Sequence, residues 1–147
     1  MENKIKKISK QVIVIRKDLN MRKGKMVAQG SHACLKAILD EFNIAPGFTY
    51  VSSDGAVGEK IMSIHIKAES ALNDWLLGRF TKICVSVNSE SELLDVYNKA
   101  KEKGLICSLI TDAGLTEFHE VPTITCCAIG PVWSDEVDEI TAGLSLL

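Results

Sequence analysis

A polar stripe near the start of the chain carries side chains that bind anions and transfer protons. In the segment RKDLNMRKGKMVAQGSHACLKA, the stripe consists of Lys25, Gln29, His32 and Lys36. At about 100° per residue, these positions fall within roughly 60° of one another on a helix. An ammonium, an amide and an imidazole on one face suit anion binding, oxyanion stabilisation or proton transfer. A solvated helix face that carries a histidine gives the same pattern, so both interpretations stay open.

Basic residues gather just ahead of this stripe. Lys17, Arg22 and Lys23 occupy a turn-forming stretch at the start of the predicted helix. Helix N-termini themselves attract anions. Residues 1–36 hold ten Lys or Arg against two acidic residues, and no Lys or Arg follows residue 103. The net charge of −2 argues against a protein that coats nucleic acid over its whole surface. The asymmetry therefore predicts a local patch for a polyanion.

A second polar group follows a predicted strand in the later part of the chain. The segment TDAGLTEF contains Asp112, a glycine that permits an unusual backbone angle, and Thr116 four residues after the aspartate. Ligands of α/β sheets usually bind beyond the carboxyl ends of strands, and both polar groups follow such strands. An aspartate at a strand end is also a common turn former, so catalytic and structural roles remain open for Asp112.

Several familiar catalytic and metal-binding signatures are absent from the sequence. The chain has no phosphate-binding loop, no dinucleotide fingerprint and no serine-hydrolase elbow. Ser31 and His32 are about 100° apart on a helix, which is poor geometry for a nucleophile and its base. His65 and His119 lack a second ligand at metal spacing, and the five cysteines form no CxxC pair. We predict no metal, no other cofactor and reduced cysteines.

Length and composition favour one globular domain over residues 1–147. The chain is 46% hydrophobic and 24% charged, which is typical of a folded domain with an independent core. No apolar run approaches the roughly 20 residues that cross a bilayer. The apolar run at residues 12–15 is also too short for a secretion signal. We therefore expect a cytoplasmic protein without a membrane partner.

Alternating helix and strand patterns predict an α/β fold. We expect a three-layer α/β/α domain with a mixed, mainly parallel four-stranded sheet. Predicted helices begin after Gly24, at Ala68, at Ser89 with a capping box to Glu92, and at Ser134. The predicted strands cover residues 10–16, 81–87, 105–110 and 123–129. Residues 1–9 are predicted to form a basic arm, and residues 46–74 an extended insertion with a β-hairpin at 48–67 around a turn at 53–55.

The two polar groups resemble motifs of the peptidyl-tRNA hydrolases of the archaeal and eukaryotic type (type 2). The segments RKDLNMRKGKMVAQGSHA, SLITDAGLTEF and VPTITCCAIGP carry the resemblance in order, together with Trp75 before the central strand. The resemblance implies a mixed sheet between helices and hydrolysis of the ester that joins a peptide to the 3′ end of tRNA. Carried over by motif position, the family's functional cluster comprises Lys25, Gln29, Ser31, His32, Asp112 and Thr116.

The chain departs from the family pattern at several positions. Gly30 stands where the family often has Cys, Leu115 where Arg is common and Glu117 where Gln is common. Residues 46–74 form a longer segment than the family usually has. The loss of a basic residue at 115 leaves the tRNA contacts on that side open. The long segment leaves substrate range and quaternary state open, including a homodimer.

Ester hydrolysis needs a positioned water, a group that takes its proton and donors for the oxyanion. His32 or Asp112 could act as the base, directly or through each other. Lys25 and Gln29 could stabilise the oxyanion or hold the substrate carbonyl, and Thr116 and Ser31 could orient these groups. The candidate side chains for tRNA phosphates are Lys17, Arg22, Lys23 and Lys36.

The leading hypothesis is a metal-independent peptidyl-tRNA hydrolase, with peptidyl-tRNA as its partner. A non-catalytic RNA-binding or protein-interaction module with the same fold is an alternative of another class. A hydrolase of smaller esters or amides is a third. The joint presence of the ammonium, amide, imidazole, carboxylate and hydroxyl in the two motifs favours the enzyme.

Overall fold

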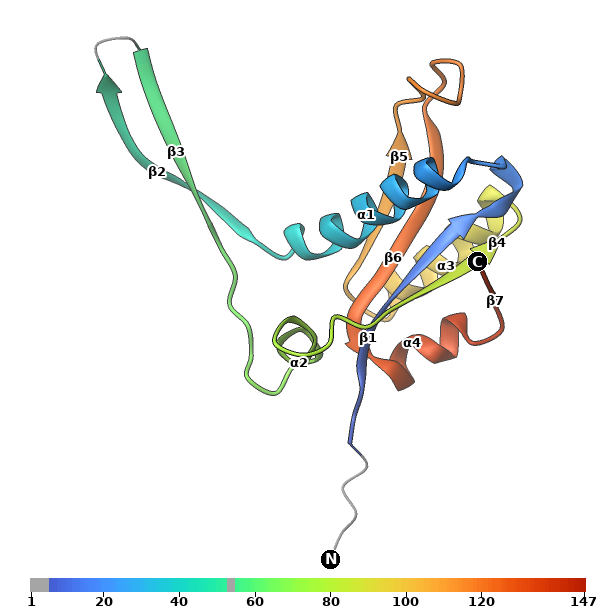
Figure 1. Ribbon diagram of the computed structural model, residues 1–147. Helices are drawn as coiled ribbons and strands as arrows, with labels where there is room; N and C mark the ends of the chain where they lie inside the picture. The colour runs from blue at the N-terminus through green and yellow to red at the C-terminus, as the bar shows by residue number, and fades with distance from the viewer. Residues whose placement is uncertain (1–5, 53–54) are drawn as a thin grey trace, which may run out of the picture.

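A central five-stranded sheet lies between helices in the computed structural model, which describes residues 6–52 and 55–147 (Figure 1). The strand order is β5-β6-β1-β4-β7, and strands β2 and β3 form a separate two-stranded sheet. The strands are β1 Ser9–Arg16, β2 Asn43–Ser52, β3 Gly55–Ser63, β4 Lys82–Val87, β5 Cys107–Asp112, β6 Thr123–Trp133 and β7 Ser145–Leu146. The helices are α1 Lys23–Leu39, α2 Ala71–Leu76, α3 Glu90–Glu102 and α4 Ser134–Thr141, and a 3-10 turn covers Lys17–Leu19.

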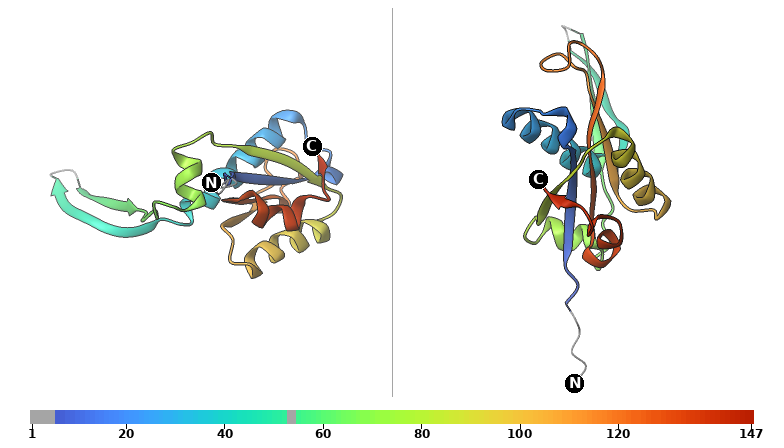
Figure 2. Two further views of the ribbon diagram at one scale, coloured as in Figure 1. Left: turned by 90° about the horizontal axis from the view of Figure 1, so that it is seen from below. Right: turned by 90° about the vertical axis from the view of Figure 1, so that its right-hand side faces the viewer.

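Strand β1 is apolar on both faces because both faces are covered. Val12 and Val14 pack in a core with α3 and α4, whereas Ile13 and Ile15 pack in a second core with α1. Figure 2 shows α1 on one side of the sheet and α3 and α4 on the other. The three layers confirm the predicted α/β/α arrangement, and the continuous apolar run of β1 is typical of a strand buried on both faces.

The sheet is mixed, as predicted, but it is mainly antiparallel rather than mainly parallel. Among the described residues, β1 and β4 are the one parallel pair of this sheet, and β1–β6, β5–β6 and β4–β7 are antiparallel pairs. Strand β5 runs in the same direction as β1, but β6 inserts between them. The loop from β5 to β6 carries no helix, so β6 returns beside β5 in the antiparallel sense. Apolar runs reveal burial on two faces and do not encode strand direction.

The count of four strands was also wrong, because β7 adds a fifth. Strand β7 has two residues, both exposed, which pair with Val85 and Ser86 of β4. Such a short exposed strand has no hydrophobic period to detect. Strand β6 is longer than the predicted segment 123–129 and continues to Trp133.

A β-hairpin projects from the body between α1 and α2, as predicted for the insertion (Figure 1). Its strand β2 begins at Asn43, five residues before the predicted start, and Pro46 lies within the strand. Strand β3 ends at Ser63, so the predicted strand does not continue to residue 67. Residues 53 and 54 of the predicted turn, and residues 1–5 of the predicted basic arm, lie outside the described residues.

Of the predicted helix starts, the capping box at Ser89 is confirmed in detail, whereas the start at Ala68 and the cap at Ser134 are wrong. The Ser89 hydroxyl accepts the Glu92 N–H at 3.1 Å at the start of α3. Ser70 caps α2, which therefore begins at Ala71 rather than at Ala68. Helix α4 has Trp133 as its N-cap residue, so Ser134 is its first helical residue and not the predicted cap. Within the described residues, no helix has both the length and the apolarity to cross a bilayer.

Candidate active site

The carboxyl ends of β1 and β5 meet at one edge of the sheet, and α1 begins there. Helix α1 crosses the face formed by β1, β6 and β5, which places its first turns beside the loop that follows β5. Lys25 of the first polar motif and Asp112 of the second form an ion pair, although they are 87 residues apart in sequence. The fold therefore brings together the two polar groups that the sequence analysis singled out.

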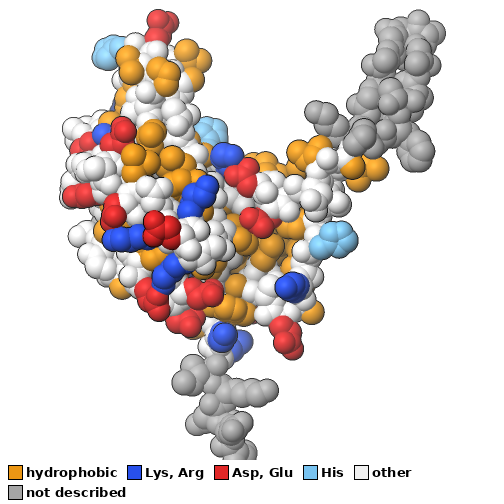
Figure 3. Space-filling view, turned by 180° about the vertical axis from the view of Figure 1, so that it is seen from behind, with side chains coloured by type: hydrophobic (Ala, Val, Ile, Leu, Met, Phe, Trp, Pro, Cys, Tyr) orange, Lys and Arg blue, Asp and Glu red, His pale blue; other side chains and the backbone are white. Residues whose placement is uncertain are grey.

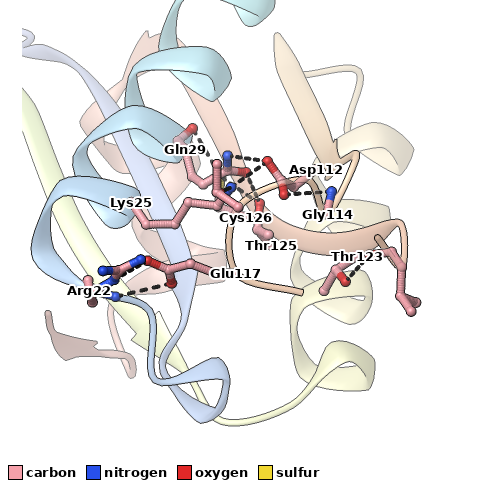
Figure 4. Close-up of polar contacts among 11 residues, drawn as sticks. Arg22, Lys25, Gln29, Asp112, Gly114, Glu117, Thr123, Thr125 and Cys126 are labelled. Atoms are coloured by element: carbon pink, nitrogen blue, oxygen red, sulfur yellow. Dashed lines mark hydrogen bonds and ion pairs between the residues drawn. The ribbon is translucent and has the colours of Figure 1, made fainter. Parts of the chain in front are cut away.

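An ammonium, a carboxylate, an amide and a hydroxyl form a direct network at this edge (Figure 4). The Lys25 Nζ donates to Asp112 Oδ1 at 2.8 Å and to Thr116 Oγ1 at 2.8 Å. The Gln29 Nε2 donates to the same Asp112 oxygen at 2.9 Å. The Lys25 and Asp112 side chains are only 11% and 14% exposed. The ion pair is consequently shielded from most of the solvent, which strengthens it relative to an exposed pair.

The second oxygen of Asp112 is held by the backbone of its own loop. The Gly114 N–H donates to Asp112 Oδ2 at 2.9 Å. Gly114 has a φ of +83°, and a Cβ at this position would lie 2.4 Å from the Val121 carbonyl oxygen. Only glycine fits both the backbone angle and this close approach. The conformation of the loop therefore fixes the carboxylate.

Hydrogen bonding makes Asp112 a stable anion. The Lys25 ammonium lowers the pKa of Asp112 below its ordinary value of 3.8, and partial burial opposes this effect. The Gly114 N–H and the Gln29 amide lower the pKa further, because both donate to the ionised form. Asp112 is therefore ionised at neutral pH, with donors on both of its oxygens.

The Gln29 side chain is oriented by a residue that the sequence analysis did not identify. Gln29 is 1% exposed, and its Oε1 accepts the Thr125 hydroxyl at 2.5 Å. This contact directs the amide nitrogen of Gln29 toward Asp112. The Cys126 thiol contacts the Gln29 backbone carbonyl at 3.3 Å and completes the packing below the amide. Thr125 could have been found only by placing β6 between β1 and β5, which no local pattern indicates.

A second ion pair lies beside the first, at the start of α1. The Arg22 Nε donates to Glu117 Oε1 at 2.8 Å, and the Arg22 N–H lies 3.4 Å from Glu117 Oε2. Arg22 is 81% exposed at its side chain, whereas Glu117 is 14% exposed. Arg22 lowers the pKa of Glu117. Arg22, a predicted phosphate ligand, thus already holds a carboxylate, and the sequence analysis noted Glu117 only as a departure from the family pattern.

An open hollow of about 520 Å³ lies over the network, and its walls include His32, Lys25, Gln29, Asp112 and Thr116. His32 is exposed on the next turn of α1. No hydrogen bond joins its ring to another residue in the described part of the chain. The structure therefore places His32 beside the cluster but leaves its ring free to meet a ligand.

Ser31 is not brought into this cluster. Its hydroxyl donates to the Val27 carbonyl of the preceding helical turn at 2.7 Å. Ser31 lines a separate apolar groove on the other flank of α1, together with Met26, Gly30 and Cys34. This direction follows from the helical spacing, because one residue turns the side chain by about 100° away from His32.

The remaining predicted phosphate ligands are exposed but differ in their contacts. Lys17 and Lys23 are exposed and have no carboxylate partner among the described residues. Lys36 is paired with Asp40 at 2.9 Å, one turn along α1. Leu115 is 78% exposed on the loop after β5, so the position that is often basic in the family presents an apolar side chain to solvent.

Comparison with known proteins agrees with this arrangement of motifs and elements. Residues 9–147 match the model of a family described as Peptidyl-tRNA hydrolase PTH2. The chain belongs to this family. The resemblance that the motifs indicated is therefore confirmed, and the PTH2 match spans the whole sheet and the helices on both of its faces.

Archaeal relatives in the PTH2 comparison align over nearly their whole length. A protein of Methanocaldococcus jannaschii named peptidyl-tRNA hydrolase is 44% identical over 138 residues, which cover 94% of this chain and 99% of the relative. Proteins of the same name from Methanothermobacter thermautotrophicus and Saccharolobus solfataricus are each 37% identical over 138 residues, with 99% and 98% of their lengths covered. Each of these relatives is named as a hydrolase.

A solved structure supports the fold of this PTH2 member independently of sequence. A protein of unknown function from Agrobacterium tumefaciens matches with a TM-score of 0.50 and 12% identity, and the match covers 95% of this chain and 97% of that chain. At this low identity the similarity extends to the fold alone.

Proposed function

We propose that this chain hydrolyses the ester bond between a peptide, or an N-blocked aminoacyl group, and the 3′ end of tRNA. We place the reaction at the network on α1 and the loop after β5. The observation that carries this proposal is the Lys25 ammonium, held at 2.8 Å from both Asp112 and Thr116 in a hollow that also exposes His32. Membership of the PTH2 family and the name of the relatives support the substrate.

Lys25 is suited to bind the oxygen that becomes negative during the reaction. Attack of water on the ester carbonyl carbon places charge on the carbonyl oxygen, and a fixed cation lowers the energy of that state. Asp112 and Thr116 use two of the three Nζ hydrogens and hold the ammonium in place. The third hydrogen is available for the substrate. Asp112 therefore acts as a positioning group that keeps Lys25 charged and aimed.

His32 is better suited than Asp112 to accept the proton of the attacking water. Both oxygens of Asp112 already accept hydrogen bonds, and its lowered pKa makes it a weak base. The imidazole of His32 is exposed, faces the hollow and has a ring nitrogen that can accept a proton. We assign proton acceptance to His32. The water oxygen bonds to the carbonyl carbon as its proton passes to His32. The carbon–oxygen bond to the ribose then breaks, and the ribose oxygen takes that proton from His32.

Exposed cations on α1 and on the turn before it supply contacts for tRNA. Lys17, in the 3-10 turn before α1, and Lys23, at the start of α1, are exposed and have no carboxylate partner among the described residues. The guanidinium of Arg22 is exposed, but its ion pair with Glu117 must break before it can bind a phosphate. The ion pair of Lys36 with Asp40 must break in the same way. We expect Lys17 and Lys23 to contribute more to the salt dependence of binding than Arg22 and Lys36.

We also propose that the reaction needs no transition metal, because Lys25 already supplies a fixed positive charge. The test is hydrolysis of N-acetyl-aminoacyl-tRNA by the purified protein with and without EDTA. Magnesium is restored in a parallel sample, since tRNA folding depends on it. We expect equal rates once magnesium is restored. A rate that returned only with Zn²⁺ would contradict the metal-free mechanism, and no hydrolysis under any condition would contradict the proposed function.

A further inference from the structure

A basic hollow lies at the opposite end of β1 from the candidate active site. Residues 6–9 and the turn 78–81 between α2 and β4 enclose a volume of about 370 Å³. Three cations line it, and they are Lys6, Lys7 and Arg79. All three side chains belong to exposed residues.

The turn that presents Arg79 has a defined shape. A Cβ at Gly78 would lie 2.3 Å from the Asp74 carbonyl oxygen, so glycine is needed where α2 ends. Phe80 has a φ of +54°, which is unusual for an aromatic residue. The Phe80 carbonyl accepts the Lys82 ammonium at 2.9 Å. The cation of Arg79 is therefore carried on a constrained turn beside the start of β4.

The positive charge of this hollow is not neutralised. Among the described residues, no carboxylate lies within 4.0 Å of the cationic groups of Lys6, Lys7 or Arg79, whereas Lys25 is ion-paired. The one carboxylate in the lining, Asp74, accepts the Ser9 hydroxyl at 2.5 Å. The lining of the hollow therefore holds three cations and one carboxylate. Such a surface attracts an extended polyanion at long range.

Aromatic rings lie next to these cations. Phe80 is 49% exposed and packs edge-on against Trp75, with ring centroids 5.1 Å apart. The Lys82 ammonium is 4.7 Å from the Trp75 ring centroid, and the Lys7 ammonium is 5.5 Å from that of Trp133. The half-exposed Phe80 ring in the lining lies next to these cations, so a base or sugar could pack on the ring while the cations contact phosphates.

We propose that this basic hollow is a second RNA-binding surface, which binds the phosphate backbone of the tRNA substrate away from the reacting ester. The inference rests on the proposed function and deepens it. Ser9 and Arg16 mark the ends of β1 and are seven residues apart. At about 3.3 Å per residue, the hollow lies roughly 23 Å from the catalytic edge. A folded tRNA spans this distance, and a short 3′ fragment does not.

The first test measures binding of deacylated tRNA, which is independent of hydrolysis. The variant Lys6→Ala with Arg79→Ala removes two charges from the hollow. Its matched control, Lys99→Ala with Lys101→Ala, removes two charges from α3, on the face where acidic and basic side chains alternate (Figure 3). We expect the hollow variant to lower the log–log salt slope of the dissociation constant by up to about 2 and the control to change it little. Equal slopes for the two variants would overturn the proposal.

The second test compares a full peptidyl-tRNA with the N-acetyl-aminoacyl ester of a CCA trinucleotide. We expect the hollow variant to raise KM for the full substrate on the order of tenfold at low salt, with kcat unchanged. Both constants for the trinucleotide ester should equal those of the wild type. A matching loss on the short ester would overturn the proposal, because it would indicate a distorted catalytic edge. If the wild type hydrolysed neither substrate, the proposed function would fail, while the binding test would still decide the role of the hollow.

Discussion

Cations at the two ends of β1 are held in different ways. At the carboxyl end, Lys25 is 11% exposed and lies between a carboxylate and a hydroxyl. At the amino end, Lys6 and Arg79 are exposed, with no carboxylate partner among the described residues. A shielded and paired cation has a fixed position, which catalysis requires. An exposed and unpaired cation retains its long-range attraction, which suits the capture of RNA.

Removal of the shielded cation should have the largest effect on turnover. Lys25→Met keeps the length of the side chain and deletes its charge. We expect kcat to fall on the order of a hundredfold to a thousandfold, which is typical for the loss of an oxyanion donor, with a smaller change in KM. Single-turnover rates on N-acetyl-aminoacyl-tRNA measure this effect. Lys23→Met, on the exposed side of the same turn, is the control and should retain near-normal kcat. Similar losses of kcat in both variants would contradict the proposed difference between the paired Lys25 and the exposed Lys23.

Removal of exposed cations near the catalytic edge should affect binding instead. For Arg22→Ala with Lys23→Ala, we expect weaker tRNA binding and a log–log salt slope reduced by about 1 to 2, with the chemical step mostly intact. Arg22 contributes less than a free cation because Glu117 already occupies its guanidinium. The measurement is the dissociation constant of tRNA over a range of salt concentrations. An unchanged slope would mean that tRNA does not contact the start of α1.

The shielded pair should also appear in the pH dependence of stability. The folded-state pKa of Asp112 is lowered from 3.8, chiefly by Lys25, so the pair stabilises the fold above about pH 4. This stability is lost as the pH falls through the lowered pKa. Denaturant unfolding between about pH 5 and pH 2 should therefore show a smaller acid-dependent loss for Lys25→Met than for the wild type. Asp18, whose pKa Arg16 lowers, contributes equally to both proteins. Identical pH profiles would mean that the pair does not persist in solution.

The smallest effect is expected at Ser31. Its hydroxyl is bonded to the Val27 carbonyl and lies on the flank of α1 away from the network. We expect Ser31→Ala to keep kcat within about twofold, because a hydroxyl bonded to its own helix contributes little to stability or to chemistry. The measurement is kcat from steady-state kinetics on the same substrate. A tenfold loss of kcat would mean that Ser31 belongs to the functional cluster that the family resemblance implied.

Local patterns were sufficient to predict the two polar motifs. The helical period placed Lys25 and Gln29 on one face, and the strand end placed Asp112 beside a glycine that its loop requires. Capping chemistry at Ser89 likewise fixed the start of α3. These features depend on residues that are near one another in sequence, where periodicity and hydrogen-bonding preference act directly.

Features that depend on pairing between distant segments could not be predicted in the same way. The insertion of β6 between β1 and β5 decides the direction of the strands and brings Thr125 to Gln29. The short strand β7 forms only because β4 offers an edge. Such contacts are set by tertiary packing, which the local sequence does not encode. The same reason explains why Glu117 was not recognised as the partner of Arg22.

The turnover of Asp112→Asn, measured together with its melting temperature, tests the catalytic assignment most directly. Asparagine keeps the shape and an oxygen for the Gly114 N–H, but it removes the charge that holds Lys25. We predict that kcat falls on the order of a hundredfold or more with only a small change in KM. Tm should fall modestly, because the Lys25 ion pair is lost. Near-normal kcat with an unchanged Tm would contradict the account, because Asp112 would then serve only to form the turn.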